Sequence, residues 1–182
     1  MKSLIVTWQG FQDQELVYPY YRLREEAEQP DDVVVMANVI GRISGIMGVN
    51  MDSHALTDEL KDESKAEYYL QNYDILVLPG GVKALEKLRQ EKHVVGFIAQ
   101  WNAMNKVIAS ICHGGQLLIS AKVVKDRRIS AYYSIKDDLS NAGAQFVDAP
   151  FVIDKNIVTS PHYQWMGEWM KAAIDCAESD MG

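Results

Sequence analysis

Residues 105–121 read NKVIASICHGGQLLISA, and this stretch gives the strongest indication of the fold class. An apolar run from Val107 to Ile111 stops at Cys112-His113-Gly114-Gly115, and a helical pattern begins immediately afterwards. A buried strand that turns sharply into a helix is the repeating unit of parallel α/β sheets. The stretch therefore predicts a strand–turn–helix corner with Cys112 at the turn.

Similar apolar runs occur elsewhere in the chain and alternate with helical patterns. The runs without clean polar–apolar alternation are SLIVTW (3–8), VVVMAN (33–38), DILVLPGG (74–81) and KVIASI (106–111). Helices are predicted over 13–28, late in 58–72, over 83–104, after Cys112, over 135–143 and over 163–178. Missing alternation is typical of strands with helices on both faces, so we expect an open α/β sandwich with a mostly parallel sheet.

The remaining segments read as short strands and turns. They are a glycine-rich hairpin (41–51), a strand (127–133), and the runs AQFVD (144–148), PFVID (150–154) and NIVTS (156–160), the last two paired through Asp154-Lys155-Asn156. No linker or change in composition divides the chain, so 1–182 is predicted to be a single domain.

Composition excludes several classes of protein. The net charge is −7 and no basic patch is visible, which argues against nucleic acid or an anionic membrane as partner. No apolar run is long enough to span a membrane, and the N-terminus lacks the apolar core of a signal peptide. Two cysteines are too few for a disulfide framework, which together with the missing signal favours the cytoplasm.

Neither a metal nor a cofactor is expected. The sequence contains no C-x-x-C and no H-E-x-x-H motif. Its histidines are scattered, at positions 54, 93, 113 and 162.

Cys112 has the surroundings of a nucleophile elbow. Ser110 and Gly114 are the small residues that a sharp turn requires two positions before and after the nucleophile. The following helix N-terminus is expected to lower the pKa of the thiol. Backbone amides of His113 and of the Gly80-Gly81 turn would point at an oxyanion. The alternative is that Cys112 is only a small buried side chain.

Two residues are candidate partners of this thiol. His113 is either a base oriented by a third group, most simply a carboxylate, or a surface histidine. Glu15 begins the helix after the first strand, so it is either a neighbour of the cleft or an ordinary charge in a first helical turn. Cys176 shares a helix face with Trp169 and is interpreted as packing.

At these residues the chain resembles the ThiJ/PfpI family, within the class I glutamine amidotransferase-like superfamily, and most closely its PfpI-type intracellular protease branch. The resemblance rests on GFQDQELVYPYYRLREE, on DILVLPGG and on the long run from ASICHGG to NIVTS. It implies a flavodoxin-like three-layer α/β/α sandwich. It also implies a nucleophilic Cys112 beside His113, a protonated Glu15 that hydrogen-bonds the thiol, and oxyanion amides from Gly80, Gly81 and His113.

The resemblance further implies a homo-oligomer in which Glu86 reaches the histidine of a neighbouring subunit. Three departures from the family pattern stand out. Gly115 replaces an expected proline, the spacing from Gly81 to Glu86 is one residue longer, and Pro161-His162 follows VTS where arginine is common. His162 and Trp165 are therefore candidates for reshaping the pocket, and loop surface is the alternative for His162.

Two functions fit these residues. The first is an enzyme whose Cys112 attacks carbonyl carbon, either a peptidase-like hydrolase or a glyoxalase or deglycase acting on methylglyoxal-type aldehydes. Its substrate would be a peptide or a small carbonyl compound. The second is an oxidative-stress sensor or chaperone-like protein in which Cys112 is oxidised.

Overall fold

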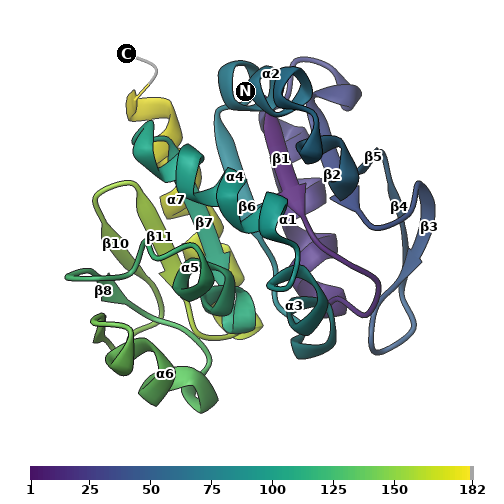
Figure 1. The fold of residues 1–182 in the computed structure, drawn as a ribbon. Coiled ribbons are helices and arrows are strands. Elements are labelled where there is room, and N and C mark those ends of the chain that lie inside the picture. The colour runs from purple at the N-terminus through teal and green to yellow at the C-terminus, as the bar shows by residue number, and fades with distance from the viewer. Residues whose placement is uncertain (181–182) are drawn as a thin grey trace.

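In residues 1–180, the part of the chain that the computed structural model describes, seven strands form one central sheet (Figure 1). Their spatial order is β10-β11-β7-β6-β1-β2-β5, and every pair is parallel except β10 with β11. The strands are β1 (Ser3–Val6), β2 (Val33–Ala37), β5 (Ala55–Leu56), β6 (Ile75–Leu78), β7 (Val107–Ile111), β10 (Val152–Asp154) and β11 (Ile157–Ser160). The predicted α/β sandwich is confirmed, while residues 181 and 182 of the predicted domain lie outside the described residues.

Helices cover both faces of this sheet. On one face α1 packs against α7, and on the other α4 packs against α2 and α5 (Figure 1). The helices are α1 (Asp13–Glu26), α2 (Glu63–Asn72), α3 (Val82–Leu88), α4 (Lys92–Ala103), α5 (Gly115–Ser120), α6 (Lys136–Asn141) and α7 (Met166–Asp180). Because both faces are covered, every residue of β1, β6, β7 and β11 is buried. This burial explains the missing alternation in those runs.

Within the described residues, four short strands lie outside the central sheet. The predicted hairpin is confirmed as the antiparallel pair β3 (Gly41–Ser44) and β4 (Asn50–Ser53). The runs at 127–133 and 144–148 form only β8 (Arg128–Ile129) and β9 (Gln145–Phe146), which pair in parallel with each other. The predicted pairing of the last two runs is also confirmed, since Asp154 lies opposite Ile157 in the β10–β11 register.

The carboxyl ends of the central strands meet at one edge, where ligands bind in open α/β sheets. Leu78 of β6 lies opposite Ser110 of β7, and Ile111 lies opposite Ser160 of β11. The chain that leaves these strands therefore gathers the Gly80-Gly81 turn, Cys112 and His162 at the same edge.

The β3–β4 hairpin is anchored to this edge by one buried carboxylate. Asp13, in the first turn of α1, accepts hydrogen bonds from the backbone amides of Met47 at 2.8 Å and Val49 at 2.7 Å. A Cβ at Gly45 would lie 2.5 Å from the Asp13 side chain, so the loop has no room for a larger residue there. The anchored loop carries Ile46 to the mouth of the cavity described below.

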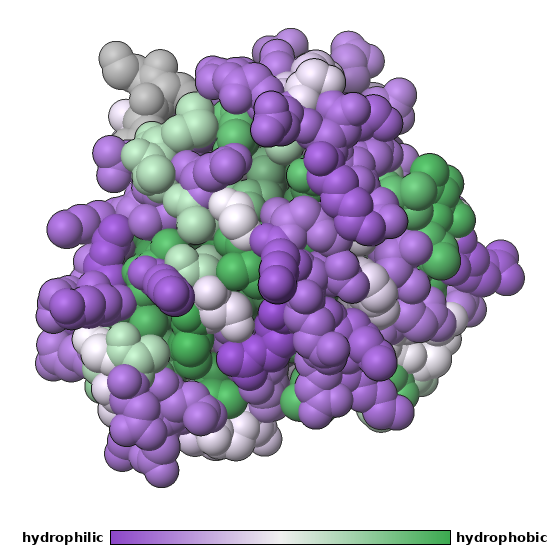
Figure 2. Space-filling model, in the orientation of Figure 1, coloured by the Kyte–Doolittle hydropathy of each residue, from purple (hydrophilic) through white to green (hydrophobic). Residues whose placement is uncertain are grey.

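Polar residues dominate the face of the molecule seen in Figure 2. Figure 2 shows that apolar side chains gather only in separate patches on the face seen there. Three exposed apolar residues, Ile46, Met47 and Val49, lie at the tip of the β3–β4 hairpin. Among the described residues, no helix combines the length and the apolar character that a membrane span needs.

Candidate active site

Cys112 lies at a strained turn between β7 and α5. Its φ is +57°, in the left-handed region that residues with a Cβ rarely adopt. A Cβ at Gly114 would lie 2.4 Å from the Leu78 carbonyl oxygen and 2.7 Å from Ser110 Oγ. Small residues on either side are therefore a steric requirement of this turn, and the elbow geometry predicted from the sequence is confirmed.

The glycine that replaces an expected proline does not disturb this corner. Gly115 begins α5 with φ −54° and ψ −25°. A proline ring fixes φ in the same range. The helix start therefore has the backbone conformation that a proline would impose.

Glu15 and Cys112 flank the same glycine. The Glu15 side chain is fully buried, and Oε2 accepts a hydrogen bond of 2.7 Å from the backbone amide of Gly80. A Cβ at Gly80 would lie 2.2 Å from Glu15 Oε2 and 3.2 Å from Cys112 Sγ. Only glycine leaves room for the carboxyl group and the thiol to approach each other here.

Burial changes the protonation of both groups. It raises the pKa of Glu15 to about 7, although the Gly80 amide and the Cys112 side chain oppose the shift. The pKa of Cys112 is also raised, by burial first and then by the Glu15 carboxylate. The backbone amides of His113 and Gly81 oppose that rise only in part. The lowered thiol pKa expected from the helix N-terminus is therefore wrong, because burial raises the pKa of Cys112 whether or not Glu15 is ionised. Above a pH of about 7 the two groups hold a single negative charge between them.

The raised pKa of Glu15 has a consequence for stability. Between the ordinary value of 4.5 and about 7, the folded chain keeps a proton that the unfolded chain has released. Folding stability is therefore highest below this window and falls as the pH rises through it, by about 3 kcal/mol in total. We expect Glu15→Gln to abolish most of this loss, measured as the difference between urea-unfolding free energies at pH 5 and pH 8. An equal pH dependence in the variant and the unsubstituted chain would rule out Glu15 as its source.

His113 lies between the thiol and a hydroxyl group. Its Nδ1 is 3.4 Å from Cys112 Sγ, and its Nε2 is 3.2 Å from Ser134 Oγ. The ring packs on Tyr132 with 4.8 Å between centroids, and partial burial lowers the pKa of His113. Ser134 occupies the position where the sequence predicted a carboxylate, and no motif points to a serine in a short 3₁₀ helix.

Glu86 is the carboxylate that the resemblance expects to reach the histidine of a neighbouring subunit. Glu86 is exposed on α3, one helical turn after Val82. Val82 lines the rim of the cavity. Glu86 therefore faces outward beside the site.

The oxyanion amides differ from the prediction in one residue. The amide of Gly80 donates to Glu15, so it is not free for a substrate oxygen, and its predicted role is corrected. The amides of Gly81 and His113 both face the Cys112 sulfur and remain the candidate donors. Gly81 adopts φ +101°, which directs the chain into α3.

A cavity of about 300 Å³ opens above the thiol. Its walls combine the predicted Glu15, Gly81, Cys112, His113 and His162 with five residues not predicted, namely Gln12, Ile46, Val82, Tyr132 and Tyr163. These five lie on loops and element ends whose meeting is set by the tertiary fold. His162 and Trp165 were predicted to shape the pocket. His162 lines the cavity, but Trp165 is absent from the described residues that line it.

Cys176 has a different environment. It is partly buried on α7 and packs against the hydrophobic core, as its helical spacing predicts. Trp169 on the same helix is fully buried.

Comparison with known proteins identifies the family of this chain. The model of the DJ-1/PfpI family matches residues 1–175. This chain belongs to the DJ-1/PfpI family. The match confirms the resemblance carried by the elbow, by the glycine turn and by the first helix.

Relatives within the DJ-1/PfpI family include proteins named as deglycases. One from Thermococcus kodakarensis is 39% identical over 175 residues, which cover 94% of this chain and 98% of that protein. Deglycase PfpI of Pyrococcus furiosus is 37% identical over 175 residues, with the same coverage of 94% and 98%. The crystal structure of a ThiJ/PfpI domain protein from Brachyspira murdochii has a TM-score of 0.85 and 19% identity, and covers 98% of this chain and 96% of that one. At this identity the likeness to the crystal structure establishes the fold alone.

Proposed function

We propose that this chain is a cysteine-nucleophile enzyme that acts on small reactive carbonyl compounds, with the deglycase-type activity for which its relatives are named. The observation that carries the proposal is the position of Cys112, held at φ +57° on the floor of a cavity of about 300 Å³. Such a volume suits a small molecule or a single modified side chain. A folded peptide segment would find little room, so a carbonyl adduct is favoured over a peptide.

The reaction begins when the thiol of Cys112 gives its proton to the Glu15 carboxylate, which leaves the single charge of the pair on sulfur. Sγ bonds to the carbonyl carbon, and the π electrons of that bond move to oxygen. The amides of Gly81 and His113 stabilise the oxyanion, and Glu15 supplies its proton. With methylglyoxal, a proton then moves from the carbon bonded to sulfur to the neighbouring carbonyl carbon, which converts the adduct into a thioester. Water attacks the thioester carbon and loses a proton, and the C–S bond breaks to release the hydroxy acid and the thiolate. Neutral His113, whose pKa is lowered by burial, is placed to take that proton at Nδ1.

The experiment measures consumption of methylglyoxal and formation of the corresponding hydroxy acid in parallel, with a fluorogenic peptide as the competing substrate. Hydroxy-acid formation without peptide cleavage supports the proposal. Peptide cleavage alone would instead support a peptidase. If neither substrate turns over while mild peroxide adds two oxygens to Cys112, as seen by mass spectrometry, the oxidation-sensor alternative replaces the enzyme.

Ser134 is expected to fix the tautomer of His113. When Ser134 Oγ accepts from Nε2–H, the bare Nδ1 faces the thiol and acts as a base. Loss of one such hydrogen bond corresponds to about a fivefold to tenfold fall in kcat. We expect this fall in Ser134→Ala, together with a shifted acid limb of the pH profile, and recovery of both in Ser134→Thr. An unchanged pH profile in the alanine variant would mean that Ser134 does not act through His113.

We also propose that the site is completed in a homo-oligomer. Two exposed apolar residues, Ile46 and Val82, line the cavity, and exposed Met47 follows Ile46. Glu86 lies one turn beyond Val82. A second copy packed here would bring its own Glu86 toward this His113. We expect a size-exclusion mass above that of one chain and a lower kcat in Glu86→Ala, with Glu178→Ala, an exposed glutamate of α7, as the control. Full activity in Glu86→Ala would exclude the contribution of a second subunit through this residue.

A further inference from the structure

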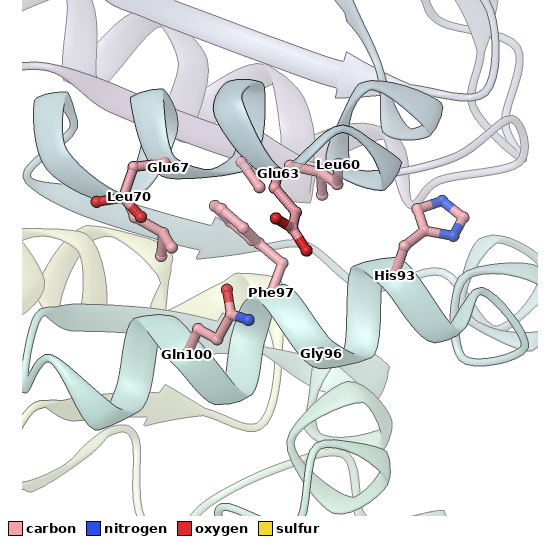
Figure 3. A pocket seen from close by; sticks show the side chains of 9 residues that line it. Leu60, Glu63, Glu67, Leu70, His93, Gly96, Phe97 and Gln100 are labelled. Atoms are coloured by element: carbon pink, nitrogen blue, oxygen red, sulfur yellow. The ribbon is translucent and has the colours of Figure 1, made fainter.

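A second group of chemically active side chains lies far from the cavity above Cys112. Asp58 comes from the 3₁₀ helix Thr57–Lys61, Glu91 from the turn before α4, and His93 from the first turn of α4. One ligand atom from each lies within 4.8 Å of the others. Figure 3 shows His93 at one end of the space between α2 and α4, into which Glu63 also points.

The imidazole of His93 is placed unusually for an ordinary ion pair. Its side chain is only 12% exposed, and Nε2 is sealed from solvent without a hydrogen-bond partner among the described residues. Nε2 lies 3.6 Å from Asp58 Oδ1, and Nδ1 lies 3.6 Å from Glu91 Oε2. Both separations are too long for hydrogen bonds. A buried ring nitrogen left without a partner requires an explanation.

The separation of 3.6 Å between His93 Nε2 and Asp58 Oδ1 suits two ligands of one metal ion. Two ligand atoms that each lie about 2.0–2.1 Å from zinc, at an angle of 110–120°, are roughly 3.4–3.6 Å apart. One imidazole and two carboxylates are also a ligand set that divalent transition metals accept. We propose that Asp58, Glu91 and His93 form a binding site for a divalent transition metal such as Zn²⁺, which ties the 3₁₀ helix Thr57–Lys61 to α4.

The surroundings supply both support and competition for the ion. Glu63 lines the adjoining cavity of about 360 Å³ and adds negative charge. Lys61 Nζ lies 2.8 Å from Asp58 Oδ1, so it competes with the metal for this carboxylate. Glu91 lies on the Nδ1 side of the His93 ring. Its side chain must therefore rotate before it can bind the same ion as Asp58 on the Nε2 side. The ligands come from positions 58, 91 and 93, a spacing that matches no metal motif, which explains why none was expected from the sequence.

The test titrates Zn²⁺ by calorimetry into the full chain carrying Cys112→Ser, which removes the thiol of the other candidate site. We expect one zinc ion per chain, at least 10-fold weaker binding in His93→Gln, and unchanged binding in the control His162→Gln. Lys61→Met is expected to bind several-fold more tightly, because Asp58 is then free. A hundredfold excess of zinc over its Kd should raise the Tm by roughly 5–10 °C.

Two results would exclude metal binding by Asp58, Glu91 and His93. One is the absence of zinc binding in the Cys112→Ser chain, which would leave Asp58, Glu91 and His93 as a cluster that binds no metal. The other is binding that survives in His93→Gln but disappears in His162→Gln. Circular dichroism shows whether His93→Gln folds. If it does not fold, the site is tested by anomalous diffraction at the zinc edge on the chain that keeps His93. The expected result is a peak between Asp58 and His93. The site does not depend on the proposed enzymatic function, since none of these outcomes requires turnover.

Discussion

Replacement of Cys112 by serine is expected to lower the turnover of methylglyoxal by about a thousandfold or more. The hydroxyl group occupies nearly the same space, so the turn at φ +57° and the hydrogen bond from Gly80 to Glu15 should persist. What disappears is the thiolate, because a serine hydroxyl does not ionise beside a carboxyl group whose pKa is about 7. Steady-state kinetics with hydroxy-acid detection measures the loss.

Cys176→Ser is the matched control for this variant. Cys176 is the second cysteine of the chain and packs on α7 against the core. Its replacement should leave kcat/KM within about twofold, with at most a modest loss of stability. If Cys112→Ser keeps substantial activity, or if Cys176→Ser removes it, Cys112 is not the nucleophile.

A methyl group at Gly80 is expected to have the second largest effect. In Gly80→Ala the added Cβ would lie 2.2 Å from Glu15 Oε2 and 2.9 Å from Cys112 Cβ, so the carboxyl group or the elbow must move. Such crowding costs typically 1–3 kcal/mol of stability. Because it also separates the two groups that share the charge, we expect kcat to fall by roughly a hundredfold or more. Denaturant unfolding and steady-state kinetics measure the two effects separately.

Gly96→Ala is the control for a glycine in open space. A Cβ at Gly96 would have no atom within 4 Å, and the residue lies inside α4. Alanine there should raise stability by up to about 1 kcal/mol and leave kcat unchanged. Equal behaviour of the two variants would mean that the space around Gly80 has no special role.

The sequence predicts the parallel sheet and the elbow because both follow from local patterns. Apolar runs without alternation mark β1, β6 and β7, and the small residues around Cys112 follow from the crowding of a sharp turn. The sequence also identifies Glu15 as a candidate site residue, since it lies in the first turn of the helix after β1, at the edge where the strands end.

Other parts of the site depend on contacts that no local pattern specifies. Ser134 contacts His113 although the two residues are 21 positions apart in the sequence. The Gly80 amide donates its hydrogen bond to the Glu15 carboxylate, 65 positions away. The raised pKa of Cys112 has the same origin. The helix N-terminus visible in the sequence favours the thiolate, but full burial and a neighbouring carboxylate appear only when the chain is folded.

The shared charge between Glu15 and Cys112 is tested most directly by the rate of Cys112 alkylation with iodoacetamide as a function of pH. The pair loses its first proton at a pKa no higher than about 7, the value of Glu15. Because the pair shares this charge, the fraction on sulfur and the alkylation rate should rise with a midpoint at or below pH 7. The rate should then remain level through pH 9, because the raised thiol pKa places the second ionisation above that range. A midpoint at or above the free-thiol value of about 8.5 would contradict the account, because the charge would then reside on Glu15.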